Sequence, residues 1–163
     1  MKIDYRDNNL IVFLNKKNIG DIDFYNKYEL QKYFRKLFLS FKNIYDLDLC
    51  GNYDINVYID KYYGAILEII DIGDDYFDYC DVIDMNIVIS KYRNFLYKLD
   101  VLIDNVDCDI YCYDGYYYYE PRNIDFLKLG FFLENGEVIF GSDVCEIKKK
   151  GNKLNSIVID KIL

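Results

Sequence analysis

An apolar stripe with helical spacing is the feature that most limits what this chain can fold into. Between residues 27 and 44, large apolar side chains recur at intervals of three and four, which places them on one face of a helix. The stripe consists of Leu30, Tyr33, Phe34, Leu37, Phe38 and Phe41. The other side carries the cations Lys32, Arg35, Lys36 and Lys42, which we interpret as a solvated face.

Strand patterns lie on both sides of this helix. The continuous apolar run from Leu10 to Leu14 predicts a strand. Alternation of apolar and polar residues from Ile55 to Asp60 predicts a second, half-buried strand. A turn over 61–64 returns the chain into residues 65–72, so the two segments are predicted to form a hairpin.

A second amphipathic helix is predicted at 90–104, where apolar residues again keep helical spacing and Ser90 is a suitable N-cap. After it the pattern indicates strands joined by the turns Asp114-Gly115, Asn135-Gly136 and Gly151-Asn152. The sequence therefore predicts an α+β fold, with a largely antiparallel sheet, two amphipathic helices and a β-rich C-terminal meander. Because no Pro, Gly or Ser-rich linker divides the chain, we expect a single domain over 1–163, with a subdivision into 1–89 and 90–163 as the alternative.

Charge is distributed unevenly along the chain, whose net charge is −8. Residues 1–45 carry nine Lys or Arg against five Asp or Glu, residues 46–89 carry one against eleven, and residues 90–163 carry ten against twelve. The middle segment repels phosphates, so direct binding of nucleic acid through this surface is not expected. A basic protein surface, including one that normally holds nucleic acid, is the expected partner, and solubility alone is the other explanation.

Six aspartates without a single cation among them make the stretch from Asp71 to Asp84 the predicted partner-binding segment. Aromatic residues interleave with them and would supply the desolvated contacts of an interface. The predicted residues are Asp71, Asp74, Asp75, Tyr76, Asp78, Tyr79, Asp81 and Asp84. We therefore expect a non-enzymatic protein-binding module, such as an inhibitor, an immunity-type protein or an adaptor, whose acidic surface mimics nucleic acid.

A tyrosine-rich hairpin provides a second candidate surface. If Asp114-Gly115 forms a two-residue turn, then Tyr113 faces Tyr116 and the strand pairing is fixed from there. One face then consists of Tyr111, Tyr113, Tyr116 and Tyr118, and the other of Ile110, Cys112, Tyr117 and Tyr119. The second face is predicted to be core. The all-tyrosine face either binds a partner or packs beneath a helix.

Common catalytic arrangements are missing from the sequence. The chain has no histidine, so Ser-His and Cys-His pairs are absent, and its nine glycines form neither a dinucleotide-binding nor a triphosphate-binding loop. No cofactor is expected. The alternative function is a Mg²⁺-dependent enzyme acting on phosphoesters through carboxylates, at Asp71, Asp74, Asp75 and Asp78 or at Asp104, Asp107 and Asp109.

The cellular setting follows from cysteine usage and hydropathy. Five cysteines (Cys50, Cys80, Cys108, Cys112 and Cys145) show no zinc-site spacing and are expected to be buried, reduced thiols. No apolar run approaches the length of a membrane span, and no export signal precedes the first strand. We therefore expect a cytoplasmic protein that does not contact membranes. The sequence leaves its oligomeric state open.

Overall fold

The computed structural model describes residues 1–6, 9–20, 22–24, 26–47, 49, 51–73, 83–90, 95–103 and 106–154. They form an α+β fold with two mostly antiparallel sheets, which confirms the predicted fold class. The chain divides into two compact units. The first contains Met1–Ile59 and Tyr63–Lys91, and the second contains Asp60–Tyr62 and Tyr92–Leu163. That the whole chain is one domain stays a prediction.

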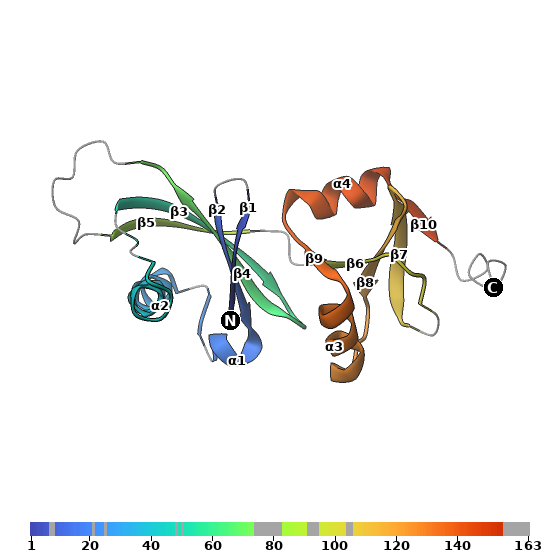
Figure 1. Cartoon of the computed structure of the whole chain (residues 1–163), viewed down its shortest axis with the longest axis horizontal. Coiled ribbons are helices and arrows are strands. Elements are labelled where there is room, and N and C mark those ends of the chain that lie inside the picture. The colour runs from blue at the N-terminus through green and yellow to red at the C-terminus, as the bar shows by residue number, and fades with distance from the viewer. Residues whose placement is uncertain are drawn as a thin grey trace. The chain divides into compact units, whose positions relative to one another are not determined.

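The first unit is built on a five-stranded sheet of order β1-β2-β4-β3-β5 (Figure 1). Its strands are β1 (Lys2–Arg6), β2 (Asn9–Asn15), β3 (Gly51–Asp60), β4 (Gly64–Asp71) and β5 (Ile83–Ile89). The predicted strand at 10–14 is confirmed as β2, and the predicted hairpin is confirmed as β3 and β4. At the edge of the sheet, β5 runs parallel to β3, with Asn86 opposite Asp54.

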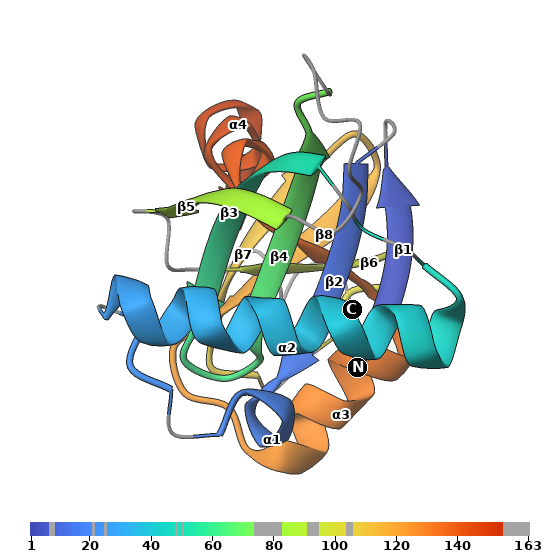
Figure 2. The same ribbon diagram turned by 90° about the vertical axis from the view of Figure 1, so that its left-hand side faces the viewer.

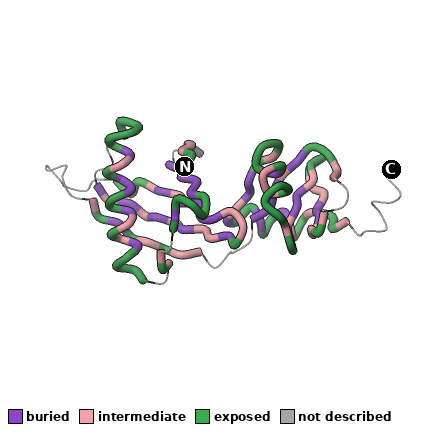
Figure 3. Tube along the Cα trace, turned by 90° about the horizontal axis from the view of Figure 1, so that it is seen from below, coloured by how far each residue is buried: buried purple, intermediate pink, exposed green. Residues whose placement is uncertain are grey.

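One long helix covers a face of this sheet. The helix predicted over 27–44 is confirmed as α2 (Lys27–Tyr45), which crosses the strands in Figure 2. The side chain of Asn26 begins it by accepting hydrogen bonds from the backbone N–H groups of Tyr28 and Glu29. Buried and exposed positions alternate along the helix (Figure 3), and the predicted cationic side is exposed. A short helix, α1 (Lys16–Ile19), follows β2.

The core of the first unit lies between α2 and the sheet. Alternate residues of each strand point toward the helix, as the twofold periodicity of a strand requires. Five helix residues and ten strand residues meet there: Leu30, Phe34, Leu37, Phe38 and Phe41, with Leu10, Val12, Leu14, Tyr53, Ile55, Val57, Ala65, Leu67, Ile69 and Met85. The intervening strand residues form the opposite face of the sheet, which we call the open face because α2 does not cover it, although Ile11, Phe13 and Ile66 on this face are buried.

The second unit is a five-stranded antiparallel sheet of order β10-β7-β8-β6-β9 with two helices. Its elements are β6 (Leu96–Leu99), β7 (Cys108–Tyr113), β8 (Tyr116–Pro121), α3 (Phe126–Asn135), β9 (Glu137–Ile139), α4 (Ser142–Lys150) and β10 (Asn152–Leu154). Phe132 of α3 stacks on Tyr97 at a ring-centroid distance of 5.4 Å. Val144 of α4 packs instead in the cluster that contains Leu96. Because consecutive strand residues point to opposite faces, the helices cover opposite sides of this sheet.

The predicted helix at 90–104 is wrong, because Leu96–Leu99 form the strand β6. Residues 91–94, 104 and 105 lie outside the described part of the chain. Tyr97 is buried on the α3 side of the sheet and Leu96 on the α4 side, so this strand is apolar on both faces. A short apolar run of that kind also satisfies helical spacing, and periodicity alone cannot separate the two.

The C-terminal meander is only partly correct. The turn at Asp114-Gly115 is confirmed, with φ values of 51° and 77° that suit a two-residue hairpin. The predicted turns at Asn135-Gly136 and Gly151-Asn152 are wrong, because Gly136 ends α3 and Gly151 ends α4. A glycine after a helix gives the same sequence signal as a glycine in a turn.

Candidate functional site

The predicted acidic segment falls mostly outside the described residues. Asp74, Asp75, Tyr76, Asp78, Tyr79 and Asp81 are all among the residues that the structure does not describe. Asp71, at the end of β4, is exposed, and its carboxylate accepts a hydrogen bond from the N–H of Gly73 at 2.8 Å. Asp84, near the start of β5, is also exposed. Two of the eight predicted residues are thus placed, both at the solvent surface of the first unit.

Further carboxylates lie on the open face of the first sheet. The strand alternation places five there, namely Asp4, Asp54, Glu68 and Asp84, which solvent reaches, and Asp60, which is buried. Lys2 shares this face and lies 3.9 Å from the carboxylate of Asp4. The cations of α2 lie on the other side of the sheet, so the first unit is acidic on one side and basic on the other.

Glu68 is the best-connected carboxylate of the open face. Its oxygens accept hydrogen bonds from the amides of Asn9 and Asn56, each at 3.2 Å, and from the Tyr58 hydroxyl at 2.8 Å. Three donors from two neighbouring strands occupy the acceptor sites of this carboxylate. This arrangement suits a structural clamp across the sheet rather than a general base, which must be free to take a proton.

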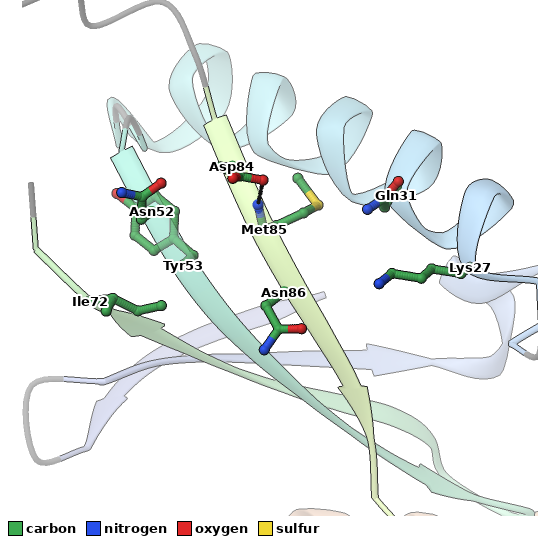
Figure 4. Close-up of a pocket in the computed structure, with 8 residues that line it drawn as sticks. All are labelled: Lys27, Gln31, Asn52, Tyr53, Ile72, Asp84, Met85 and Asn86. Atoms are coloured by element: carbon green, nitrogen blue, oxygen red, sulfur yellow. Dashed lines mark hydrogen bonds between the residues drawn. The ribbon is translucent and has the colours of Figure 1, made fainter. Parts of the chain in front are cut away.

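A surface hollow of about 560 Å³ opens beside the edge strand β5 (Figure 4). Lys27 and Gln31 of α2 lie along one side, and the other lining residues are Asn52, Tyr53, Ile72, Asp84, Met85 and Asn86. The Asp84 carboxylate accepts a hydrogen bond from the N–H of Met85 at 2.8 Å. Its described lining residues include one carboxylate and one amine, which offer polar contacts but are not a pair of catalytic groups.

The tyrosine hairpin has the predicted register, with Tyr111 opposite Tyr118 and Tyr113 opposite Tyr116. Tyr111 and Tyr118 are buried under α4, where they share a cluster with Ile147. Tyr116 remains exposed, with the amine of Lys98 4.0 Å from the centre of its ring, and Tyr113 is half-buried. Tyr113 also packs against this cluster, so the packing alternative describes three of the four tyrosines, and Tyr116 is the exposed member of the face.

The second carboxylate cluster binds cations of the protein itself. The carboxylate of Asp109 accepts a hydrogen bond from Arg122 and lies 3.0 Å from the amine of Lys153. The Arg122 hydrogen bond, with smaller help from Lys153, holds the pKa of Asp109 below its usual value. Asp107 lies 3.9 Å from the same guanidinium, and Asp104 is outside the described residues. Within the described ranges, no three His, Cys, Asp or Glu side chains gather as a metal site.

The thiols of the second unit are free cysteines. Burial, with a contribution from Asp107, raises the pKa of Cys108 to about 12, which makes it a poor nucleophile. Cys108 and Cys112 both lie on β7. Cys145 is exposed on α4, so the expectation of burial is wrong there, while Cys50 and Cys80 lie outside the described residues.

The sequence reasoning missed the helix α3, whose outer side is apolar and exposed. Its exposed large side chains are Phe126 (88%), Leu127 (87%), Phe131 (43%) and Leu133 (39%), and we call them the α3 patch. Only Phe132 of this helix is fully buried. The composition of residues 126–135 is the signal that could have revealed it. Large apolar side chains lie on the exposed side of α3 as well as on its buried side. Large exposed apolar patches mark interaction surfaces more often than scattered exposed residues do.

Comparison with protein-family models, with curated protein sequences and with solved structures finds no match to this chain. No helix in the described part of the chain has the length and apolar character needed to cross a membrane.

Proposed function

We propose that this protein is a non-enzymatic protein-binding module that engages a basic partner protein, as an inhibitor, immunity-type protein or adaptor. The observation that carries the proposal is the α3 patch. Phe126 and Leu127 are almost fully exposed although each would gain roughly 1.5–3 kcal/mol from burial. A partner that covers them would recover that free energy, which makes them suitable anchors of an interface.

Charge supports the choice of a basic partner. The net charge is −8, and the exposed Asp71 and Asp84 bound a segment with four further aspartates. An acidic surface speeds the approach of a basic protein, while apolar anchors slow its release. We assign the acidic surface to association and the α3 patch to retention. No observation in the described part of the chain favours the carboxylate-dependent enzyme over this function.

The test compares three forms of the full chain as baits in extracts of the native cell. Leu127→Asp should lose a partner that the wild type retains, by about tenfold or more in recovered protein. Leu39→Asp is the matched control, because Leu39 is 60% exposed on α2. The captured protein should be basic, and the loss should recur with the purified partner in calorimetry. A partner retained equally by all three forms would contradict the assignment of retention to α3.

Leu127→Asp should not unfold the protein. Leu127 is 87% exposed and lies in the first turn of α3, where an acidic side chain is favourable for the helix dipole. Unchanged circular dichroism and Tm for this variant therefore separate a lost interface from a lost fold.

A further inference from the structure

Gly130 lies at the centre of the α3 patch, and nothing in the described part of the chain requires a glycine there. A Cβ atom added at Gly130 would meet nothing within 4 Å. Gly20, Gly73 and Gly115 also have open space at this position, but each has a positive φ that favours glycine. Gly130 lies inside a regular helix, where glycine is about 1 kcal/mol less favourable than alanine.

The neighbours of Gly130 on the helix surface define a notch. Residues three and four positions away are adjacent on a helix, and here they are Phe126, Leu127, Leu133 and Glu134. All four are exposed. Three raised apolar side chains and one carboxylate thus surround a point where the helix backbone is uncovered. Glycine at such a point allows another backbone to approach closely.

We infer that the α3 patch receives one amphipathic helix of a partner protein, which crosses α3 over Gly130 and places a Lys or Arg beside Glu134. This inference rests on the proposed function and specifies the partner's structure. An apolar side chain of the partner fills the notch between Phe126 and Leu133. Its cation pairs with the carboxylate of Glu134, for which no ion pair is found among the described residues.

The size of the patch favours a single helix over a second copy of this chain. A fully exposed Phe or Leu side chain offers roughly 150–200 Å², so the four patch residues together offer about 400–500 Å². A stable dimer needs about 800 Å² from each partner. One helix laid across α3 can cover a patch of this size completely.

Charge also disfavours self-association. A two-fold pair of α3 helices centred on Gly130 would bring Glu134 opposite either Glu134 or Phe126 of the second copy. Neither contact gives the carboxylate a cation, and an unpaired charge in an interface is costly. A basic amphipathic helix supplies the missing charge, in agreement with the basic partner expected from the sequence.

The test uses displayed peptides of about 15 residues with amphipathic helical patterns, selected on the full chain and counter-selected on Leu127→Asp. Selected peptides should carry Lys or Arg one turn from a central apolar residue. Gly130→Leu should weaken their binding about tenfold or more, and Glu134→Lys should shift selection toward acidic peptides. Gly130→Ala should raise the Tm by about 2–4 °C while weakening peptide binding. Leu39→Asp is again the control that should change nothing.

Failure of this inference can be told from failure of the proposed function. If the peptides bind Leu127→Asp and the wild type with equal affinity, α3 is not the binding surface. That result would overturn both this inference and the proposed function. Binding lost in Leu127→Asp but unchanged in Gly130→Leu, with circular dichroism showing both variants folded, would leave the protein-binding function standing and refute the crossing over Gly130. A concentration-dependent dimer, or flotation with phosphatidylserine vesicles, that Leu127→Asp abolishes would identify the occupant as a second copy or a membrane and overturn the inference.

Discussion

Asp109 is held by cations from two sides, and this makes its contribution to stability dependent on pH. The hydrogen bond from Arg122 and the amine of Lys153 favour the ionised carboxylate, so the pKa of Asp109 is lower in the folded than in the unfolded chain. A carboxyl group whose pKa is lower in the folded state stabilises the protein at pH values above its unfolded-state pKa, which is about 3.9 for Asp. This stabilisation is lost as the pH falls through the pKa of the folded state.

We therefore expect Asp109→Asn to lower the Tm by about 1–3 °C at pH 7, a small effect because the pair is partly screened by solvent. The difference from the wild type should shrink as the pH falls below about 4. Thermal unfolding followed by circular dichroism at pH 7 and pH 3 measures it. Asp100→Asn, at an exposed bend, is the matched control for removal of a surface carboxylate. An equal loss at both pH values would mean that packing, not charge, accounts for the effect.

At the level of single residues, the tyrosine hairpin could be predicted to the exact strand partner. Asp114-Gly115 fixes the register, and Tyr111 therefore pairs with Tyr118. Which of these tyrosines is accessible could not be predicted, because burial depends on α4 packing onto them from later in the chain. Local turn chemistry decides pairing, whereas burial is decided by tertiary contacts.

Among the elements, α2 depends on its first turn as well as on its buried stripe. Asn26 satisfies two backbone N–H groups that would otherwise lack a partner within the helix. We expect Asn26→Ala to destabilise the protein by about 1 kcal/mol, with a Tm lower by about 2–4 °C. Asn43→Ala is the control, because Asn43 is exposed within the same helix and alanine is favourable there. Urea unfolding of both variants checks this, and equal effects would show that the cap is not the cause.

The other elements show why α2 could be predicted while three elements of the second unit could not. α2 buries one side only, so its sequence alternates with helical period. β6 is covered on both faces, and α3 is apolar on its exposed side as well, so neither carries an amphipathic signal. α4 ends in Lys148, Lys149 and Lys150 before Gly151, and a glycine followed by asparagine is also typical of a turn. The α3 patch could not be predicted either, because the helix that carries it has no amphipathic pattern.

For the whole molecule, the excess of negative charge has opposite effects on folding and on association. Changing Asp74, Asp75, Asp78 and Asp81 to Asn would reduce the net charge from −8 to −4. Because like charges repel, we expect this variant to be as stable as the wild type or more stable at low salt, and to lose that advantage at about 1 M salt.

The same variant should associate more slowly with the basic partner, with a smaller dependence of the rate on salt. Stopped-flow or surface-based binding kinetics measure the association rate and its salt dependence. The partner for these measurements is the protein whose capture depends on Leu127. Leu127→Asn, which removes the apolar side chain without changing the net charge, should instead speed dissociation and leave the salt dependence of association unchanged. If the association rate of the neutralised variant is unchanged, the acidic segment contributes to solubility and not to binding of the partner.

The parallel pairing of β5 with β3 has a consequence for the order of folding. Asn86 bonds to Asp54 across a sequence separation of 32 residues, whereas Tyr58 bonds to Glu68 across only 10. Closing the longer loop costs more chain entropy, and a parallel pair cannot grow outward from a tight turn. We therefore expect the β3–β4 hairpin to form before β5 joins, and until then β3 presents an unpaired edge. Open strand edges pair readily with other chains, so β3 is open to pairing with another molecule until β5 joins and becomes the edge strand in its place.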